Sequence, residues 1–370
     1  MMSENKPIAS FVHFSDFHLG EMIYDGGRHE LDPGWQIKQG IFNWTSPNIN
    51  VQKHDEELVK YFQHELNACK SIDGEKIYLN KADAFFLTGD IVSDAYSEQI
   101  INNFAYPYFT SKSLDDKPNH PSPKKFGLNI KPDKLIAIPG NHDKHLSNTL
   151  DGYQKSDFCV NTQNNKFAEH QKFDYENHKI INGQPFLIFA LDSNLYKDKT
   201  FAEGEISQEQ INWVQETMDD YKSNGVVFSE EEKEVPFEDC IKILLIHHSP
   251  KDINPQHHWG IPQGPYKRGK YNTHAIKNSH KVFADLENYF DIIFCGHFHT
   301  HYSALINNKS PLLIMAGTAT EWTDLFDEKA YNSFNYLQIY PRKKVKLTVF
   351  TNRRARESFE PEASKHFQII

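Results

Sequence analysis

Short apolar runs recur along the chain, and each of them ends abruptly in polar residues. Every run has the length of a strand and contains β-branched or aromatic side chains, which is typical of strands buried on both faces. We therefore predict a buried strand in each of these segments. They lie at residues 11–16, 84–90, 134–143, 186–194, 242–250 and 291–299.

Helical patterns lie between some of the predicted strands. Residues 53–70 place apolar side chains on one face of a helix, and a further helix is predicted over residues 280–290. Ser207 followed by Gln210 has the spacing of a capping box, which predicts that a helix begins there. Strands that alternate with helices predict an α/β (α+β) fold.

The pattern becomes more β-like after residue 303. The last two apolar runs alternate with polar residues and predict a hairpin around residues 341–343. Because the chain contains no repeat, no low-complexity tract and no convincing linker, we expect a single domain over residues 1–370. Its core is predicted at residues 11–303, followed by a β-rich closing segment at residues 304–350.

Composition and charge narrow the possible functions. The 370-residue chain is 38% hydrophobic and 13% aromatic, as in globular proteins, and carries a formal net charge of −10. This charge argues against a broad electrostatic grip on nucleic acid, so a nucleic-acid partner is not favoured. Four cysteines without paired spacing, no secretory signal and no apolar run of about 18 residues predict a cytoplasmic protein that does not enter a membrane.

The polar residues that end the apolar runs are all of a type that binds metal ions or moves protons. Groups at the carboxyl ends of strands converge in an open α/β sheet, and residues two apart on an extended chain point the same way. We therefore expect these side chains to meet, with glycines before three of the clusters allowing a close approach of the backbone. In chain order the side chains are Asp16, His18, Asp90, Asn141, His142, Asp143, His247, His248, His297 and His299.

Carboxylate, imidazole and carboxamide donors without a thiolate suit Mn, Fe or Zn. Seven such donors exceed the need of one tetrahedral ion, so we expect two divalent or trivalent transition-metal ions about 3.5–4 Å apart that share a carboxylate. Each cluster alone has an ordinary interpretation, since Asp-x-His is usually a strand end, Gly-Asp a turn and His-His a core pair. Five clusters of one chemical kind, each at the exit of an apolar run, would be an odd coincidence.

The ordered blocks "DFH", "GD", "GNHD", "HH" and "GHFH" resemble the calcineurin-like metallophosphoesterase superfamily over about residues 11–300. The resemblance implies a four-layer α-β-β-α sandwich, with two mixed sheets face to face and helices outside. It implies a metal ligand at His247, although the residues alone do not separate His247 from His248. His142 would face the substrate phosphate and Asp143 would orient the His142 imidazole. The implied ligands are Asp16, His18, Asp90 and His299 for one ion, and Asp90, Asn141, His247 and His297 for the other.

The chemistry expected of such a centre is phosphoester hydrolysis by a metal-bridging hydroxide, with His142 protonating the leaving oxygen. Pro139, Asp143 and the segment 89–94 depart from the phosphoprotein phosphatase branch. What remains is more similar to the class III cyclic nucleotide phosphodiesterases. We therefore expect a phosphodiesterase that acts on a small-molecule or nucleotide-type phosphoester.

Substrate choice is expected to depend on insertions around the site. Residues 251–274 contain Trp259 for base stacking and Lys267 with Arg268 for phosphate, although loop packing and solvated charge is the more common interpretation. A nuclease or a phosphomonoesterase of the same fold stays as an alternative, but a nuclease would be expected to show a longer basic track. A catalytically silent metal-binding scaffold for protein interaction is another alternative, and it would be expected to lack a ligand.

Overall fold

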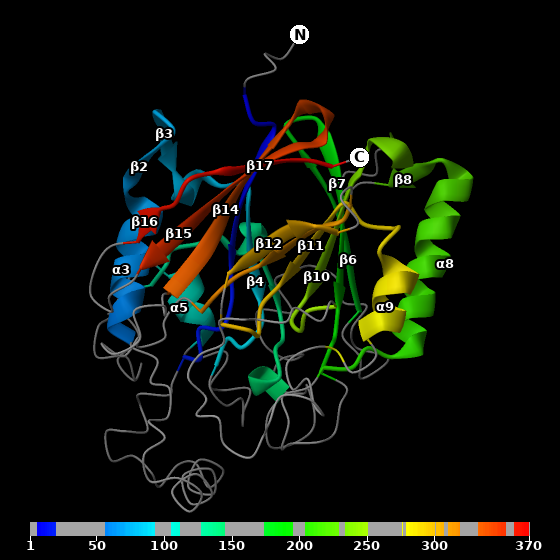
Figure 1. Cartoon of the computed structure of the whole chain (residues 1–370), viewed down its shortest axis with the longest axis horizontal. Coiled ribbons are helices and arrows are strands. Elements are labelled where there is room, and N and C mark those ends of the chain that lie inside the picture. Colours follow the sequence, from blue (N-terminus) through cyan, green and yellow to red (C-terminus); the bar gives the residue numbers. More distant parts are fainter. Residues whose placement is uncertain are drawn as a thin grey trace, which may run out of the picture.

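In the described part of the chain, the computed structural model has two large β-sheets that pack face to face, with helices against their outer faces (Figure 1). This confirms the predicted α/β class and the two mixed sheets. The structure describes residues 6–19, 56–92, 105–111, 127–144, 174–194, 204–228, 234–250, 276, 279–299, 301–306, 310–318, 332–352 and 359–369.

The first sheet has seven strands among the described residues, in the order β16-β15-β14-β1-β4-β5, with β17 also paired to β15. β1, β4 and β5 run parallel, so their carboxyl ends lie at one edge, whereas β14 is antiparallel to β1. The strands are β1 (Ala9–Phe14), β4 (Ala84–Thr88), β5 (Leu135–Ile138), β14 (Asn332–Tyr340), β15 (Lys344–Asn352), β16 (Glu360–Pro361) and β17 (Lys365–Gln368).

The second sheet has six strands in the described part of the chain, in the order β12-β13-β11-β10-β7-β6. Its four central strands are parallel, and the outer strands β6 and β12 are antiparallel to their neighbours. The strands are β6 (Asp174–Ile181), β7 (Gln184–Leu191), β10 (Ile241–Ile246), β11 (Ile292–Cys295), β12 (Tyr302–Leu305) and β13 (Leu312–Met315). Two short hairpins add β2 (Cys69–Ile72) with β3 (Glu75–Tyr78), and β8 (Val226–Phe228) with β9 (Glu234–Pro236).

Helices cover the outer faces of both sheets. Figure 1 shows two of them beside the first sheet, α3 (Glu56–Asn67) and α5 (Tyr106–Thr110). Among the described residues, α8 (Gln208–Asn224) and α9 (Ser279–Leu286) lie beside the second sheet. Single 3-10 turns are η2 (Leu79–Lys81), η4 (Pro132–Lys134), η5 (His142–Lys144), η7 (Phe237–Asp239) and η9 (Pro341–Lys343).

Alternation along β1 explains why the layers stack in this order. Phe11 points toward the second sheet, where its ring centroid lies 5.3 Å from that of Phe186. Phe14, three positions on, points the other way and lies 5.5 Å from Phe62 of α3. Because successive side chains of a strand alternate between its two faces, one strand builds both core layers.

Several local predictions are confirmed by the structure. Ser207 Oγ accepts the backbone N–H of Gln210 at 3.2 Å, and Gln210 Oε1 accepts that of Ser207 at 3.4 Å, so the capping box starts α8 as predicted. The hairpin around residues 341–343 joins β14 to β15, with Tyr340 opposite Lys344. β14 then pairs directly with β1, so β14 and β15 of the closing segment lie in the first sheet, whereas β13 lies in the second.

The helix predicted over residues 53–70 was wrong at its C-terminal end. Among the described residues it covers Glu56–Asn67, and Cys69 is exposed at the start of β2. Beyond Asn67 the chain pairs as β2 with β3 instead of continuing the helix. No helix in the described ranges combines the length and apolarity needed to cross a membrane.

Candidate metal centre

The predicted donor residues lie at one edge of the molecule, where strands of both sheets end. Asp16, Asp90 and Asn141 follow β1, β4 and β5 of the first sheet. His247 and His297 follow β10 and β11 of the second. Because the two sheets pack face to face, the donors from the two edges meet, as the strand-end argument predicts.

One group of four donors combines two carboxylates with two imidazoles, and its donor atoms all lie within 4.8 Å of one another. His18 Nε2 lies 3.2 Å from His299 Nε2 and 3.6 Å from Asp90 Oδ2. Asp16 Oδ1 lies 3.5 Å from His299 Nε2. Asp16, His18 and Asp90 are buried, and His299 is only partly exposed.

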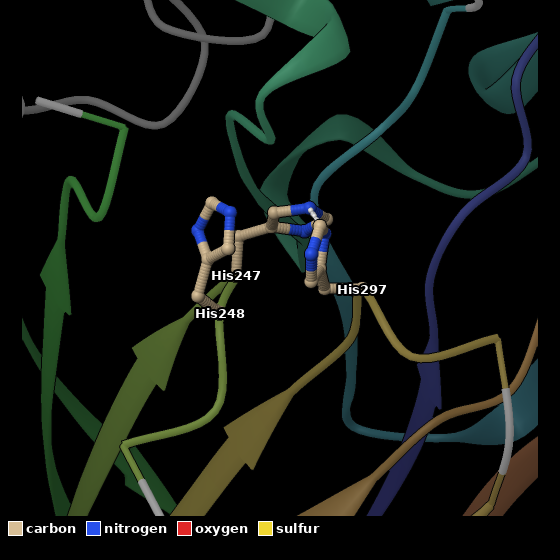
Figure 2. Close-up of side chains that lie close together, drawn as sticks. All are labelled: His247, His248 and His297. Atoms are coloured by element: carbon tan, nitrogen blue, oxygen red, sulfur yellow. Dashed lines mark hydrogen bonds between the residues drawn. The ribbon is translucent and has the colours of Figure 1, made fainter. Parts of the chain in front are cut away.

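A second group adjoins the first through Asp90. His247 Nε2 lies 3.4 Å from Asp90 Oδ2 and 3.1 Å from Asn141 Oδ1. It also lies 3.2 Å from His297 Nδ1. Figure 2 shows the side chains of His247 and His297 next to each other. Asp90 therefore stands between the two groups, with one carboxylate oxygen near His18 and His247 alike.

The orientation of His247 follows from its hydrogen bond to the backbone of β4. Its Nδ1 donates to Thr88 O at 2.7 Å, and a carbonyl oxygen only accepts, so the proton lies on Nδ1. In the neutral imidazole, Nε2 then presents its lone pair toward Asp90 and Asn141. A ligating imidazole commonly has its second nitrogen held in this way. The contacts of His247 Nε2 with Asp90 and Asn141 favour His247 over His248 for this position.

Five of the predicted donors have left-handed backbone conformations. The residues are Asp16, His18, Asp90, His297 and His299, with φ between 46° and 72°. A positive φ is uncommon for residues other than glycine and tends to occur at functional sites. Asp16 and His18, and likewise His297 and His299, therefore bring their side chains together through tight turns. The expectation that an extended chain aligns these pairs was wrong.

Three glycines of the centre have no room for a side chain, as their positions in the sequence predicted. A Cβ on Gly140 would overlap Asp90 Oδ1, and one on Gly296 would overlap Ser15 Oγ. A Cβ on Gly89, which has φ +92°, would overlap His247 Nδ1. Glycine is required here because backbone and ligand side chains are in direct contact.

His142 and Asp143 lie beside the two groups on η5. The His142 ring centroid is 4.5 Å from that of His18, and its backbone N–H donates to Asp90 Oδ1 at 2.9 Å. The buried Asp143 carboxylate accepts the backbone N–H groups of Gly140, Ile91 and Val92 at 2.8–3.1 Å. In the described structure Asp143 thus orients the turn that carries His142.

Charge and burial compete at Asp90 and His247. Burial raises the pKa of the Asp90 carboxyl, but His247, His142 and His18 together outweigh burial and hold this pKa well below its usual range. Burial likewise lowers the pKa of His247, while Asp90 and then Asp16 raise it to about 9. The pKa of Asp143 is raised to about 7 by burial and by Asp90. The centre therefore stabilises positive charge beside its carboxylates.

The donors fit transition-metal ions. Nitrogen and oxygen atoms that can each present a lone pair face one another at 3.1–3.6 Å, a spacing that favours a cation between them. Asp16 Oδ1 is buried and receives no hydrogen bond from the part of the chain that the structure describes. The set of imidazole, carboxylate and carboxamide without thiolate matches Mn, Fe or Zn.

Sequence reasoning missed supporting residues that touch the donors. Thr88 O also accepts Ser15 Oγ–H at 2.9 Å, and Thr318 Oγ–H donates to Asp16 O at 2.9 Å. Ser193 contacts His248, and the run 186–194 does end in Asp-Ser-Asn like the other runs, so this signal was present. Trp259, Lys267 and Arg268, predicted to bind substrate, lie outside the described residues.

Comparison with known proteins identifies relatives at the level of family and fold. The family model described as calcineurin-like phosphoesterase matches residues 9–301. No curated protein matches the chain significantly. A dimetal phosphatase from Danio rerio superposes with a TM-score of 0.55 at 9% identity, covering 99% of this chain and 100% of that chain.

Two further solved structures are similar over most of their length. GAP50, the anchor in the inner membrane complex of Plasmodium, has a TM-score of 0.47 and 9% identity, covering 98% of this chain and 89% of that chain. Wild-type Vps29 from Entamoeba histolytica, complexed with zinc, has a TM-score of 0.33 and 10% identity, covering 97% of this chain and 99% of that chain.

Proposed function

Because the chain belongs to the calcineurin-like phosphoesterase family, whose members are metal-dependent phosphoester hydrolases, we propose that it is a binuclear phosphodiesterase. The observation that carries the proposal is the position of Asp90. Its Oδ2 lies 3.6 Å from His18 Nε2 and 3.4 Å from His247 Nε2, so one carboxylate can serve two ions. Shared carboxylates of this kind are typical of two-metal hydrolases.

The proposal assigns the donors to two positions. Ions bound there would stabilise negative charge on phosphoryl oxygens and lower the pKa of water at the centre. The first position would use Asp16, His18, Asp90 and His299, and the second Asp90, Asn141, His247 and His297.

His142 is proposed to protonate the leaving oxygen. It is half-buried, its ring contacts His18, and its backbone N–H donates to Asp90, so its imidazole would lie close to a phosphate bound at the centre. A general acid of this kind contributes about 10²–10⁴-fold. His142→Ala should therefore lower turnover by about that factor on an alkyl ester and much less on a p-nitrophenyl ester, measured with equal metal content. Equal losses on both esters would contradict the role.

The preference for diesters rests on the departures from the phosphoprotein phosphatase pattern at Pro139 and Asp143. The proposed substrates are small or nucleotide-type phosphodiesters, with Trp259, Lys267 and Arg268 as candidate contacts. Hydrolysis of bis-p-nitrophenyl phosphate with Mn²⁺ should exceed that of p-nitrophenyl phosphate and disappear on chelation. Faster cleavage of the monoester would favour a phosphomonoesterase.

Two outcomes separate the remaining alternatives. Metal uptake without turnover of either ester would favour the silent scaffold for protein interaction. Degradation of long single-stranded DNA or RNA at rates above those of small diesters would favour a nuclease. The cytoplasmic location suggested by the cysteine content stays a prediction.

A further inference from the structure

A third histidine accompanies His247 and His297 in the second position. One ring nitrogen from each of His247, His248 and His297 lies within 4.8 Å of the others. All three residues are buried, and Figure 2 shows them converging from the ends of β10 and β11. Two ligands on opposite sides of one ion are about 4.2 Å apart when each bond is about 2.1 Å. A small shift of one ring thus brings all three within reach of a single ion.

The His248 ring is clamped in its place. Its Nδ1 lies 2.8 Å from Ser193 Oγ, and the same oxygen accepts the backbone N–H of His248 at 3.1 Å. A Cβ on Gly204 would overlap the ring, so that backbone segment presses on one side of it. On the other side the ring centroid of His297 is only 4.2 Å away.

This arrangement is the one that a ligating histidine usually has. An oxygen holds one ring nitrogen and thereby directs the other toward the ion, as Thr88 O does for His247. For His248 the holding oxygen is Ser193 Oγ, which contacts Nδ1, so Nε2 is the nitrogen that would face the ion. Two neighbouring histidines at the end of β10 are thus each anchored through Nδ1 to an oxygen.

We propose that His248 is a third imidazole donor to the ion of the second position, a role that rests on the proposed two-metal function. The consequence is a chemical difference between the two positions. The first position holds two carboxylates with two imidazoles, whereas the second would hold three imidazoles with Asp90 and Asn141. Imidazole-rich sites favour Zn²⁺ and Co²⁺ over Mn²⁺, so the second position should discriminate against Mn²⁺.

The test is Co²⁺ titration of metal-free protein, followed by visible absorption and by metal counting after gel filtration. The wild type should bind two Co²⁺ ions. His248→Ala should weaken binding at one of them by about 10–100-fold and change its absorption band, while the other ion binds unchanged. His64→Ala removes an exposed histidine, with a side chain 76% exposed, and should alter neither step.

Further variants separate a ligand from a merely structural residue. Ser193→Ala removes the anchor and should weaken the same step by a smaller factor. His248→Gln, similar in volume, replaces His248→Ala if that variant unfolds early in a thermal scan, and should show the same loss. If the variant at His248 is folded and both of its Co²⁺ binding steps are unchanged, the inference is wrong and the two-metal function stands. Equal weakening of both Co²⁺ binding steps would lead to the same conclusion. A wild type that binds no ion would overturn both proposals.

Discussion

The two sheets contribute different chemistry to the same centre. The first sheet supplies every oxygen donor, through Asp16, Asp90 and Asn141, together with a single imidazole. The second supplies imidazoles only, from the ends of β10 and β11. The first edge alone offers a single imidazole and the second edge offers no oxygen donor among these residues, so the full donor set forms only when the sheets are docked.

The contacts between the two sheets also differ in kind between the interior and the edge that carries the donor side chains. Away from the centre they are aromatic, as where Phe86 lies 5.0 Å from Phe294 between ring centroids. At the donor edge they are hydrogen bonds, such as His297 N–H to Asp16 Oδ2 at 3.0 Å and His247 Nδ1–H to Thr88 O. Apolar contact is non-directional, whereas hydrogen bonds specify relative position, so the polar edge aligns the donors.

Removing the carboxylate common to both groups should have the largest effect. Asp90→Asn takes away the negative charge next to His18 and His247, and we expect turnover to fall by about 10³-fold or more with loss of bound metal. Steady-state kinetics and metal counting check this. Retention of both ions with near-normal turnover would remove the basis for a shared carboxylate.

A methyl group at the tightest glycine should act more locally. Gly140→Ala forces Cβ against Asp90, so activity should drop by about 10–100-fold and stability by about 1–3 kcal/mol in urea unfolding. Gly74→Ala is the matched control, because its φ is +82° but its Cβ would meet open space. It should cost about 1 kcal/mol from the backbone alone and leave metal binding unchanged.

The contrast between the polar edge and the apolar interior can be tested with two substitutions. Asn335 of β14 donates through Nδ2 to Met315 O and to His13 Nδ1, each at 3.1 Å, so it links the sheets. Asn335→Leu should weaken metal binding by about 10-fold. Phe186→Leu should cost about 1–2 kcal/mol of stability and leave metal affinity within about 2-fold. Equal effects of the two substitutions on metal affinity would contradict the proposed difference between polar and apolar contacts.

The smallest effect concerns His13, which lies between the sheets. Burial, and secondarily His301, lower the pKa of His13 from 6.5 to about 3. Its Nε2 lies 2.9 Å from Thr88 Oγ. Because the unfolded chain binds the proton more tightly, this contribution to stability is complete above pH 6.5 and is lost as pH falls toward 3.

His13→Asn should therefore reduce the acid sensitivity of folding. Between about pH 6.5 and pH 5 the wild type should lose about 2 kcal/mol more than the variant, at about 1.4 kcal/mol per pH unit. Urea unfolding at several pH values measures the difference. Parallel curves for the two proteins would show that His13 is protonated in the folded state.

Local signals in the sequence predicted much of this molecule. The capping box at Ser207, the hairpin around residues 341–343 and the requirement for Gly140 all appear as predicted. Each depends on neighbouring residues or on a conformation that one residue type favours. The end of α3 was missed at Cys69 because pairing of β2 with β3 competes there with helix periodicity.

The local sequence determines the chemical identity of the donors and their positions at strand ends, because side-chain type and strand length are local properties. Packing of strands within each sheet, and of the two sheets against each other, decided the rest. It placed Asp90 between His18 and His247, directed Asp143 to backbone N–H groups and brought His248 beside His297. These contacts join residues far apart along the chain, and only packing of the whole core determines which atoms meet.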